Sequence, residues 1–231
     1  ALEAAVVSAE AFDPATSVRH WHLSLSDLGE ILFLPQLAEA LLRDSPSSQL
    51  SNLAVPAERV SAALEARDID IAVGILSPAH RGIAEEVLFH ERYVAISRPD
   101  WVPPRKAGGA RRRRELGADD LRAAALAVAS PIATYHAGIE RMLKRLRLSD
   151  HPVLRARHYA AFPEIIARTD VVALVPLMYA RALAPRHPVQ IWEMPGIAPA
   201  YEVRMLWHQS VTGDPAHAWL RGVLRGLFGR G

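Results

Sequence analysis

The feature that most constrains this chain is a regular alternation of strand-like and helix-like segments over its first 78 residues. His20–Leu25 alternates in polarity as a strand does, and a helical stripe of apolar residues follows it to about Arg43. Strand-like runs at 50–55 and 69–75 flank a helix-forming stretch at 57–66. Such alternation predicts a parallel sheet whose strands are joined by right-handed helical crossovers.

A second series of the same kind occupies the C-terminal half. Its strand-like runs lie at 126–129, 154–159, 171–175, 189–192 and 202–207, and its helical patterns lie at 138–146, 161–168 and after 176. Asp214 and Pro215 predict the start of a last amphipathic helix, as a capping residue and a first-turn proline. Between the two series, 83–96 contains two strand-like runs and 99–120 is predicted to be a loop.

Composition excludes several classes of protein. The chain has 231 residues, 50% of them hydrophobic, which suits one large domain or two small lobes with a packed core. Without cysteine it has no disulfide framework, thiolate zinc site or cysteine nucleophile. The net charge is +2, and removing the four arginines Arg111 to Arg114 makes it −2, so we expect no basic DNA-binding face. No apolar run reaches the ~18 residues of a membrane span, and no leader is visible, so we expect no membrane partner.

Local motifs give little support for catalysis. The chain lacks the glycine-rich phosphate-binding patterns, the H-E-x-x-H zinc motif and the G-x-S-x-G nucleophile turn. His20 and His22 share one face of a strand without an evident third ligand, so a surface pair is expected rather than a metal site. We therefore expect a protein that is not an enzyme and has neither cofactor nor metal.

Ser26 and Asp27 stand where the first predicted strand turns into a helix. Asp27 and Glu30 have the spacing of a capping box, with aspartate in place of the usual serine or threonine. Three roles are open for the pair: helix capping alone, capping combined with a ligand contact, and catalysis.

Three further polar residues fall at strand ends in the second series. Ligands of open α/β sheets lie at the carboxyl ends of strands, where Thr134, His136 and His158 are found. Together they predict a polar pocket for a small anion, whereas a lone histidine in such a place is often an ordinary loop residue.

Several longer motifs together resemble one known family. The N-terminal half carries F-D-P-A-T-S-x-R at 12–19, L-S-D-x-G-E at 25–30, D-I-D-x-A-x-G at 68–74 and L-F-x-E-R-Y-V at 88–94. The C-terminal half carries T-x-H at 134–136, H-Y at 158–159, T-D-x-x-A-x-V-P at 169–176 and L-W-H at 206–208. Over about residues 12–228 the chain resembles the effector-binding domain of LysR-type transcriptional regulators. It is most similar to the branch that responds to salicylate and nitroaromatic compounds, with the flavonoid-responsive nodulation regulators as a near alternative.

The resemblance implies an α/β fold like that of type 2 periplasmic binding proteins, with two Rossmann-like lobes joined by two crossover strands. The first lobe would take residues 13–92 and 199–231, and the second would take 93–198. Residues 1–12 would be the end of a linker helix, and the family's N-terminal winged helix-turn-helix is absent from this chain. The effector would lie between the lobes, in contact with Ser26, Asp27, Thr134, His136, His158 and Phe162.

The resemblance also implies a function. We expect a ligand-sensing domain that binds a small aromatic or carboxylate effector and transmits lobe closure to DNA-binding domains missing here. A solute-binding protein of a transport system has the same fold and is the alternative. The full-length regulator would be cytoplasmic, would form a homodimer or tetramer, and would contact DNA only through its N-terminal domain. The stripe of Leu34, Leu37 and Leu41 is longer than one core contact needs, and the last helix carries a comparable stripe, so we expect these helices to take part in pairing. The alternative is that both stripes belong wholly to the core.

The run Arg111 to Arg114 lies in the predicted loop, and we expect it to be solvated and to play no part in the switch. Deleting residues 107–114 from the full-length regulator should therefore leave effector-dependent transcription intact. A reporter-gene assay measures this, and loss of induction in a deletion variant that still folds would assign the loop to the mechanism.

Overall fold

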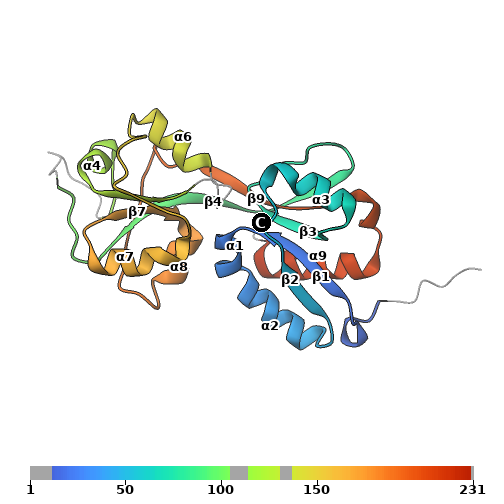
Figure 1. The fold of residues 1–231 in the computed structure, drawn as a ribbon. Helices are drawn as coiled ribbons and strands as arrows, with labels where there is room; N and C mark the ends of the chain where they lie inside the picture. Colours follow the sequence, from blue (N-terminus) through green and yellow to red (C-terminus); the bar gives the residue numbers. More distant parts are fainter. Residues whose placement is uncertain (1–11, 105–113, 131–136, 230–231) are drawn as a thin grey trace, which may run out of the picture.

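The computed structural model describes residues 12–104, 114–130 and 137–229. Figure 1 shows two halves joined by the long strands β4 (Ile83–Ser97) and β9 (Ala200–His208). The described strands form one sheet in the order β2-β1-β3-β9-β4-β7-β5-β6, and β8 pairs with β4. This arrangement confirms the predicted fold of two α/β lobes joined by two crossover strands. The predicted helix over 1–11 and the arginines at 111–113 lie outside the described residues.

The half that contains the N-terminal strands, called lobe I below, is built on three parallel strands. β1 (His20–Leu25) lies between β2 (Gln49–Asn52) and β3 (Ile71–Gly74). Its helices are α1 (Asp27–Leu32), α2 (Leu34–Asp44), α3 (Val60–Ala66) and α9 (Pro215–Phe228), with short 3-10 turns at Pro14–Thr16, Ala57–Arg59 and Gln209–Val211. The apolar side chains of α2 and α9 join the core on one face of the sheet, and those of α3 join a separate cluster on the other.

The other half, called lobe II below, repeats this plan. β5 (Leu126–Ala129) lies between β6 (Leu154–Ala156) and β7 (Val172–Pro176), all parallel, and β8 (Gln190–Trp192) pairs with β4. Its helices are α4 (Ala118–Ala123), α6 (Ala137–Arg145), α7 (Phe162–Arg168) and α8 (Leu177–Leu183), with a 3-10 turn at Tyr159–Ala161. α4 and α6 cover one face of the sheet, and α7 and α8 cover the other (Figure 1).

The crossover strands form the connection between the lobes. β4 pairs with β9 in antiparallel register from Ile83, opposite His208, to Arg92, opposite Ala200, with a shift between Val87 and Phe89. Beyond Arg92, β4 continues as a strand of lobe II and pairs with β7 and β8. The two strand-like runs predicted within 83–96 are thus one strand, because the ladder to β9 resumes after the irregularity.

The helix predicted from Asp27 to about Arg43 is two helices that meet at Phe33. Pro35 occupies the first turn of α2, where a backbone N–H has no partner within the helix and its absence costs nothing. The break turns the Phe33 ring into the core, with its centroid 6.0 Å from that of Phe89 and 4.7 Å from that of Phe228.

The predicted pairing role of the Leu34, Leu37 and Leu41 stripe is wrong for its central residue. Leu37 is 2% exposed and lies in the core, and Leu34 and Leu41 are partly buried against it. The stripe packs within lobe I, because α2 lies against α9 as well as against the sheet. Leu42, which points away from the core, is 71% exposed.

A buried polar network holds α9 to the rest of lobe I. Asp214 caps α9 by accepting from the backbone N–H of His217, as predicted, and it also pairs with Arg19. The Nε2–H of His217 donates to the carbonyl of Asp70 at 3.1 Å, while Nδ1 accepts from Arg221 at 2.7 Å. This arrangement requires a neutral imidazole, and burial accordingly lowers the pKa of His217.

The His217 network makes the stability of lobe I sensitive to acid. Because the folded state disfavours protonation of His217, its contribution is complete above the ordinary histidine pKa of about 6.5 and is lost as the pH falls below it. The free energy of unfolding should therefore drop between about pH 7.5 and about pH 5.5. In His217→Gln, which keeps a donor and an acceptor without titrating, denaturant titrations should show a smaller drop. An equal drop in both proteins would contradict this.

Candidate functional site

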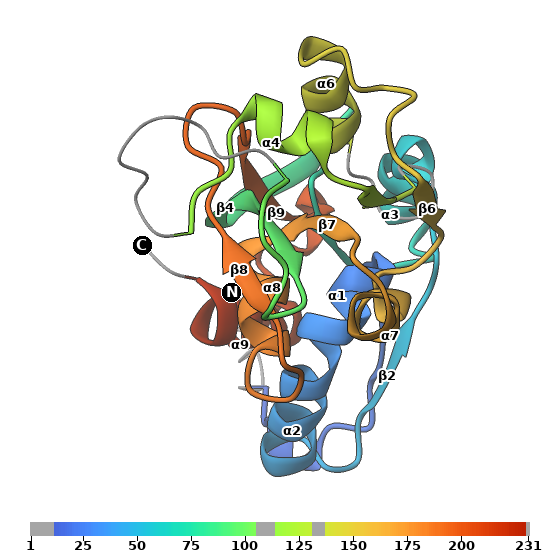
Figure 2. The same cartoon turned by 90° about the vertical axis from the view of Figure 1, so that its left-hand side faces the viewer.

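A pocket lies at the junction of the lobes, lined by residues of α1, α8 and the crossover strands. At this junction α1 lies beside α8 (Figure 2). The enclosed part of this pocket is small, with a cavity volume of about 30 Å³, and the space around it is open to solvent. Both lobes and both crossover strands contribute to its wall, and most of the lining side chains are apolar. They are Ser26, Leu28, Gly29, Leu32, Phe33, Val73, Gly74, Ile75, Phe89, Glu91, Pro176, Met178, Tyr201 and Val203.

The floor of this junction pocket consists of two pairs of cross-strand neighbours on β4 and β9. Phe89 lies opposite Val203, and Glu91 lies opposite Tyr201. Alternate residues of a strand point to one face, so Phe89 and Glu91 project together toward α1. The floor thus combines an apolar surface with one carboxylate.

Close packing of α1 shapes the opposite wall. A Cβ added to Gly29 would lie 2.9 Å from the Cβ of Leu25, closer than two carbon atoms approach without strain. Glycine at this position lets α1 lie against the end of β1, so that Leu28 and Leu32 reach the pocket.

Glu91 connects the crossover strand to lobe II. Its Oε2 accepts from the backbone N–H of Met178 at 2.7 Å, and its Oε1 accepts from the backbone N–H of Arg92 at 2.7 Å. The residue that precedes α8, Pro176, offers no side-chain cap, so the carboxylate of Glu91 satisfies a free donor of the first turn of α8. This explains how a carboxylate can be 8% exposed among apolar neighbours.

Ser26, not Asp27, caps α1. The Ser26 hydroxyl accepts from the backbone N–H of Gly29 at 3.3 Å. The capping box predicted for Asp27 and Glu30 is wrong, since the Glu30 carboxylate instead accepts from the side chain of Asn52 on β2. Helix α1 begins one residue earlier than the spacing suggested, which places Asp27 in its first turn and frees that carboxylate for another contact.

Asp27 bridges the two lobes. Its Oδ2 accepts from the backbone N–H of Tyr159 at 2.8 Å and lies 3.7 Å from Nδ1 of His158. Burial raises the pKa of the Asp27 carboxyl, opposed by the hydrogen bond from Tyr159 and by the charge of His158. As at α8, a carboxylate from outside lobe II supplies the partner for an uncapped helical turn, here Tyr159–Ala161.

Of the predicted site residues, the structure brings Ser26, Asp27 and His158 to the junction. Ser26 lines the pocket, and Asp27 and His158 meet beside it. Phe162 is fully buried, packed edge-on against Tyr159 with ring centroids 5.7 Å apart. Thr134 and His136 lie outside the described residues.

Sequence reasoning did not single out Glu91, Met178 or Tyr201 for the site. A signal for Glu91 was present: a glutamate in the strand-like run at 83–96, on the same side of the strand as Phe89 and Tyr93. Met178 donates through its backbone and Tyr201 contributes a ring, so their roles depend on which strands are neighbours.

Neither a metal site nor a membrane span is evident in the part of the chain that the structure describes. Within it, no three histidine, aspartate or glutamate side chains are grouped as metal ligands would be. The His20 and His22 rings stack with centroids 4.3 Å apart, and His20 hydrogen-bonds Ser51. No helix among these residues is long and apolar enough to cross a bilayer.

The fold and the site together define a two-lobed binding domain with a small pocket at its hinge. The profile of the family described as "LysR substrate binding domain" matches residues 16–229. The chain belongs to this family.

Named relatives are transcription regulators. The chain is 28% identical to the HTH-type transcriptional activator NagR of Ralstonia sp, over 98% of this chain and 73% of the relative. It is 29% identical to the HTH-type transcriptional activator NahR of Pseudomonas putida, over 99% of this chain and 73% of the relative.

Solved structures share the fold. A probable transcriptional regulator from Pseudomonas aeruginosa is 28% identical, with a TM-score of 0.76 over 94% of this chain and 69% of that one. The regulatory domain of MexT from the same organism, at 21% identity, has a TM-score of 0.75 over 92% of this chain and 99% of its own.

The separate contacts of Ser26 and Asp27 predict different effects of replacing them. Ser26→Ala removes the cap of α1 and should lower the free energy of unfolding by about 1 kcal/mol without moving the lobes. Asp27→Ala removes the acceptor for Tyr159 and should let the lobes separate, whereas Asp27→Asn keeps an acceptor and should retain most of the contact.

Denaturant titration measures the first effect, and the radius of gyration from small-angle X-ray scattering measures the second. An unchanged radius of gyration for Asp27→Ala would show that Asp27 does not hold the lobes together.

Proposed function

We propose that this chain is the ligand-sensing domain of a LysR-type transcriptional regulator and binds a small aromatic effector between its lobes. The observation that supports this most is the junction pocket, whose wall is shared by α1, the crossover strands and the start of α8. Its mostly apolar lining with a few polar groups suits an aromatic ring. Ser26, Asp27, His158 and Phe162 are proposed effector contacts, together with Thr134 and His136.

A ligand that touches both lobes stabilises the arrangement in which they are close. The switch then depends on the difference in affinity between closed and open forms, and such coupling is usually about 1–3 kcal/mol. In this proposal lobe I comprises residues 13–92 and 199–231, and lobe II comprises 93–198. Rotation between them would be passed through residues 1–12, the end of a linker helix, to a DNA-binding domain outside this chain.

The full-length regulator is proposed to be a cytoplasmic homodimer or tetramer that contacts DNA through its N-terminal domain and performs no catalysis. The relatives named above are regulators of transcription, and this favours a sensor over the alternative of a transport protein. Because the Leu37 side of α2 is buried, the outer surface of α2 around Leu42 is the better candidate for the pairing contact.

The proposal predicts that some small aromatic compounds stabilise the chain against heat and that His158 contributes. A ligand at 100 times its Kd adds about 2.7 kcal/mol to the free energy of unfolding, which a thermal-shift screen detects readily. His158→Ala should reduce the shift, because the side chain is half-exposed beside Asp27 at the lobe junction.

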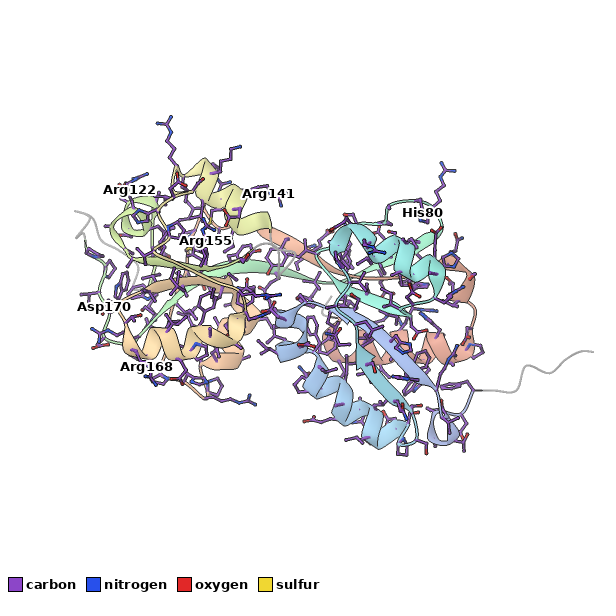
Figure 3. All side chains as sticks on the ribbon, viewed as in Figure 1. His80, Arg122, Arg141, Arg155, Arg168 and Asp170 are labelled. Atoms are coloured by element: carbon purple, nitrogen blue, oxygen red, sulfur yellow. The ribbon has the colours of Figure 1, made fainter. Side chains whose placement is uncertain are left out.

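The matched control is His80→Ala, which removes another exposed histidine at the far end of lobe I (Figure 3). This variant should respond like the wild type. Equal shifts in the wild type and His158→Ala would remove His158 from the site, and the absence of any aromatic ligand would overturn the proposed function.

A further inference from the structure

Resting on the proposed function, we propose that the junction pocket selects uncharged aromatic molecules that carry a hydrogen-bond donor, such as aromatic amides and phenols, over aromatic carboxylates. The argument combines the charge of the pocket, the occupation of its backbone donors and the acceptors that remain.

The charge of the pocket is negative. Glu91 is the only charged side chain among the described lining residues. It is largely buried between Phe89, Tyr201 and the start of α8. A ligand carboxylate placed here would face a carboxylate of the protein across a medium of low polarity, where like charges repel strongly. An uncharged ligand of the same shape avoids this repulsion.

Two helical starts of lobe II that face the junction already bind carboxylates of the chain itself. The N–H of Met178 at the start of α8 donates to Glu91, and the N–H of Tyr159 donates to Asp27. At α1 the N–H of Gly29 donates to Ser26. A ligand carboxylate would have to displace Glu91 or Asp27 to bind the N–H of Met178 or that of Tyr159.

Acceptors, by contrast, remain available. Each oxygen of Glu91 accepts one hydrogen bond and has a second lone pair. A ligand N–H or O–H can satisfy such oxygens, whereas a ligand carboxylate has only acceptors to offer.

Nearby cations are engaged elsewhere. Arg92, next to Glu91 in sequence, pairs with Glu193, and Arg204 pairs with Glu85 and Glu202. Arg122 and Arg168 lie on the side of lobe II that is remote from α1 (Figure 3). Burial raises the pKa of Tyr93, and the charge of Arg141 is near enough to oppose that rise, but Arg141 does not line the pocket.

The test compares matched pairs of ligands that differ in one group. Benzamide against benzoate, and salicylamide against salicylate, exchange an uncharged amide for a carboxylate on the same ring. Isothermal titration calorimetry of the wild-type chain should give the amide at least about tenfold tighter binding than the acid within a pair.

A charge variant links the preference to Glu91. Glu91→Gln keeps the size of the side chain and removes its charge, so the ratio of the two dissociation constants should fall toward one. Glu85→Gln is the matched control, because Glu85 lies on the same strand, is exposed and does not line the pocket. It should keep the wild-type ratio.

The outcomes separate this inference from the proposed function. Carboxylates that bind the wild type as tightly as their amides would overturn the inference and leave the effector-binding role standing. Failure of every aromatic compound to bind would overturn both. If Glu91→Gln does not fold, the wild-type ratio still decides, and an unchanged ratio in a folded Glu91→Gln would assign the selectivity to other residues.

Discussion

The antiparallel pairing of β4 with β9 is the constraint on which the rest of the structure depends. Its ladder runs through lobe I and the junction, and β4 then becomes a strand of lobe II. Any change in the angle between the lobes has to be absorbed by these two strands. The register shift between Val87 and Phe89 interrupts the ladder where Phe89 meets the pocket, and such irregularities locally bend and twist a strand. Phe89 therefore belongs both to the connection between the lobes and to the lining of the pocket.

Two carboxylates add a second connection. Asp27 from α1 and Glu91 from β4 each accept from the backbone at a helical start of lobe II, where the preceding residues, His158 and Pro176, provide no cap. The contacts supplement the apolar core that contains Leu28 and Leu32 of α1 together with Tyr159. Glu91 also places a carboxylate in the lining of the junction pocket.

Much of the local structure could be predicted from sequence. The predictions agree with the structure for the bounds of β1 and β5 and for the capped start of α9 at Asp214. They succeed there because strand periodicity and helix caps depend on residues that are close together in the sequence. The predictions failed where a distant contact decides. The Phe33 ring packs between Phe89 and Phe228 and ends α1, and Asn52 takes the Glu30 carboxylate away from the expected capping box.

The sequence by itself determined the class of fold, the family and the placement of Ser26, Asp27 and His158 at strand ends. These follow from periodicity and short motifs, which can be recognised in consecutive residues without knowing which elements are neighbours in the fold. Only the tertiary structure decided that Asp27 binds Tyr159, that Glu91 faces the pocket and that Phe162 is buried. Each of these depends on elements far apart in the chain, and no local pattern records which strand lies beside which or which backbone donor lacks a partner.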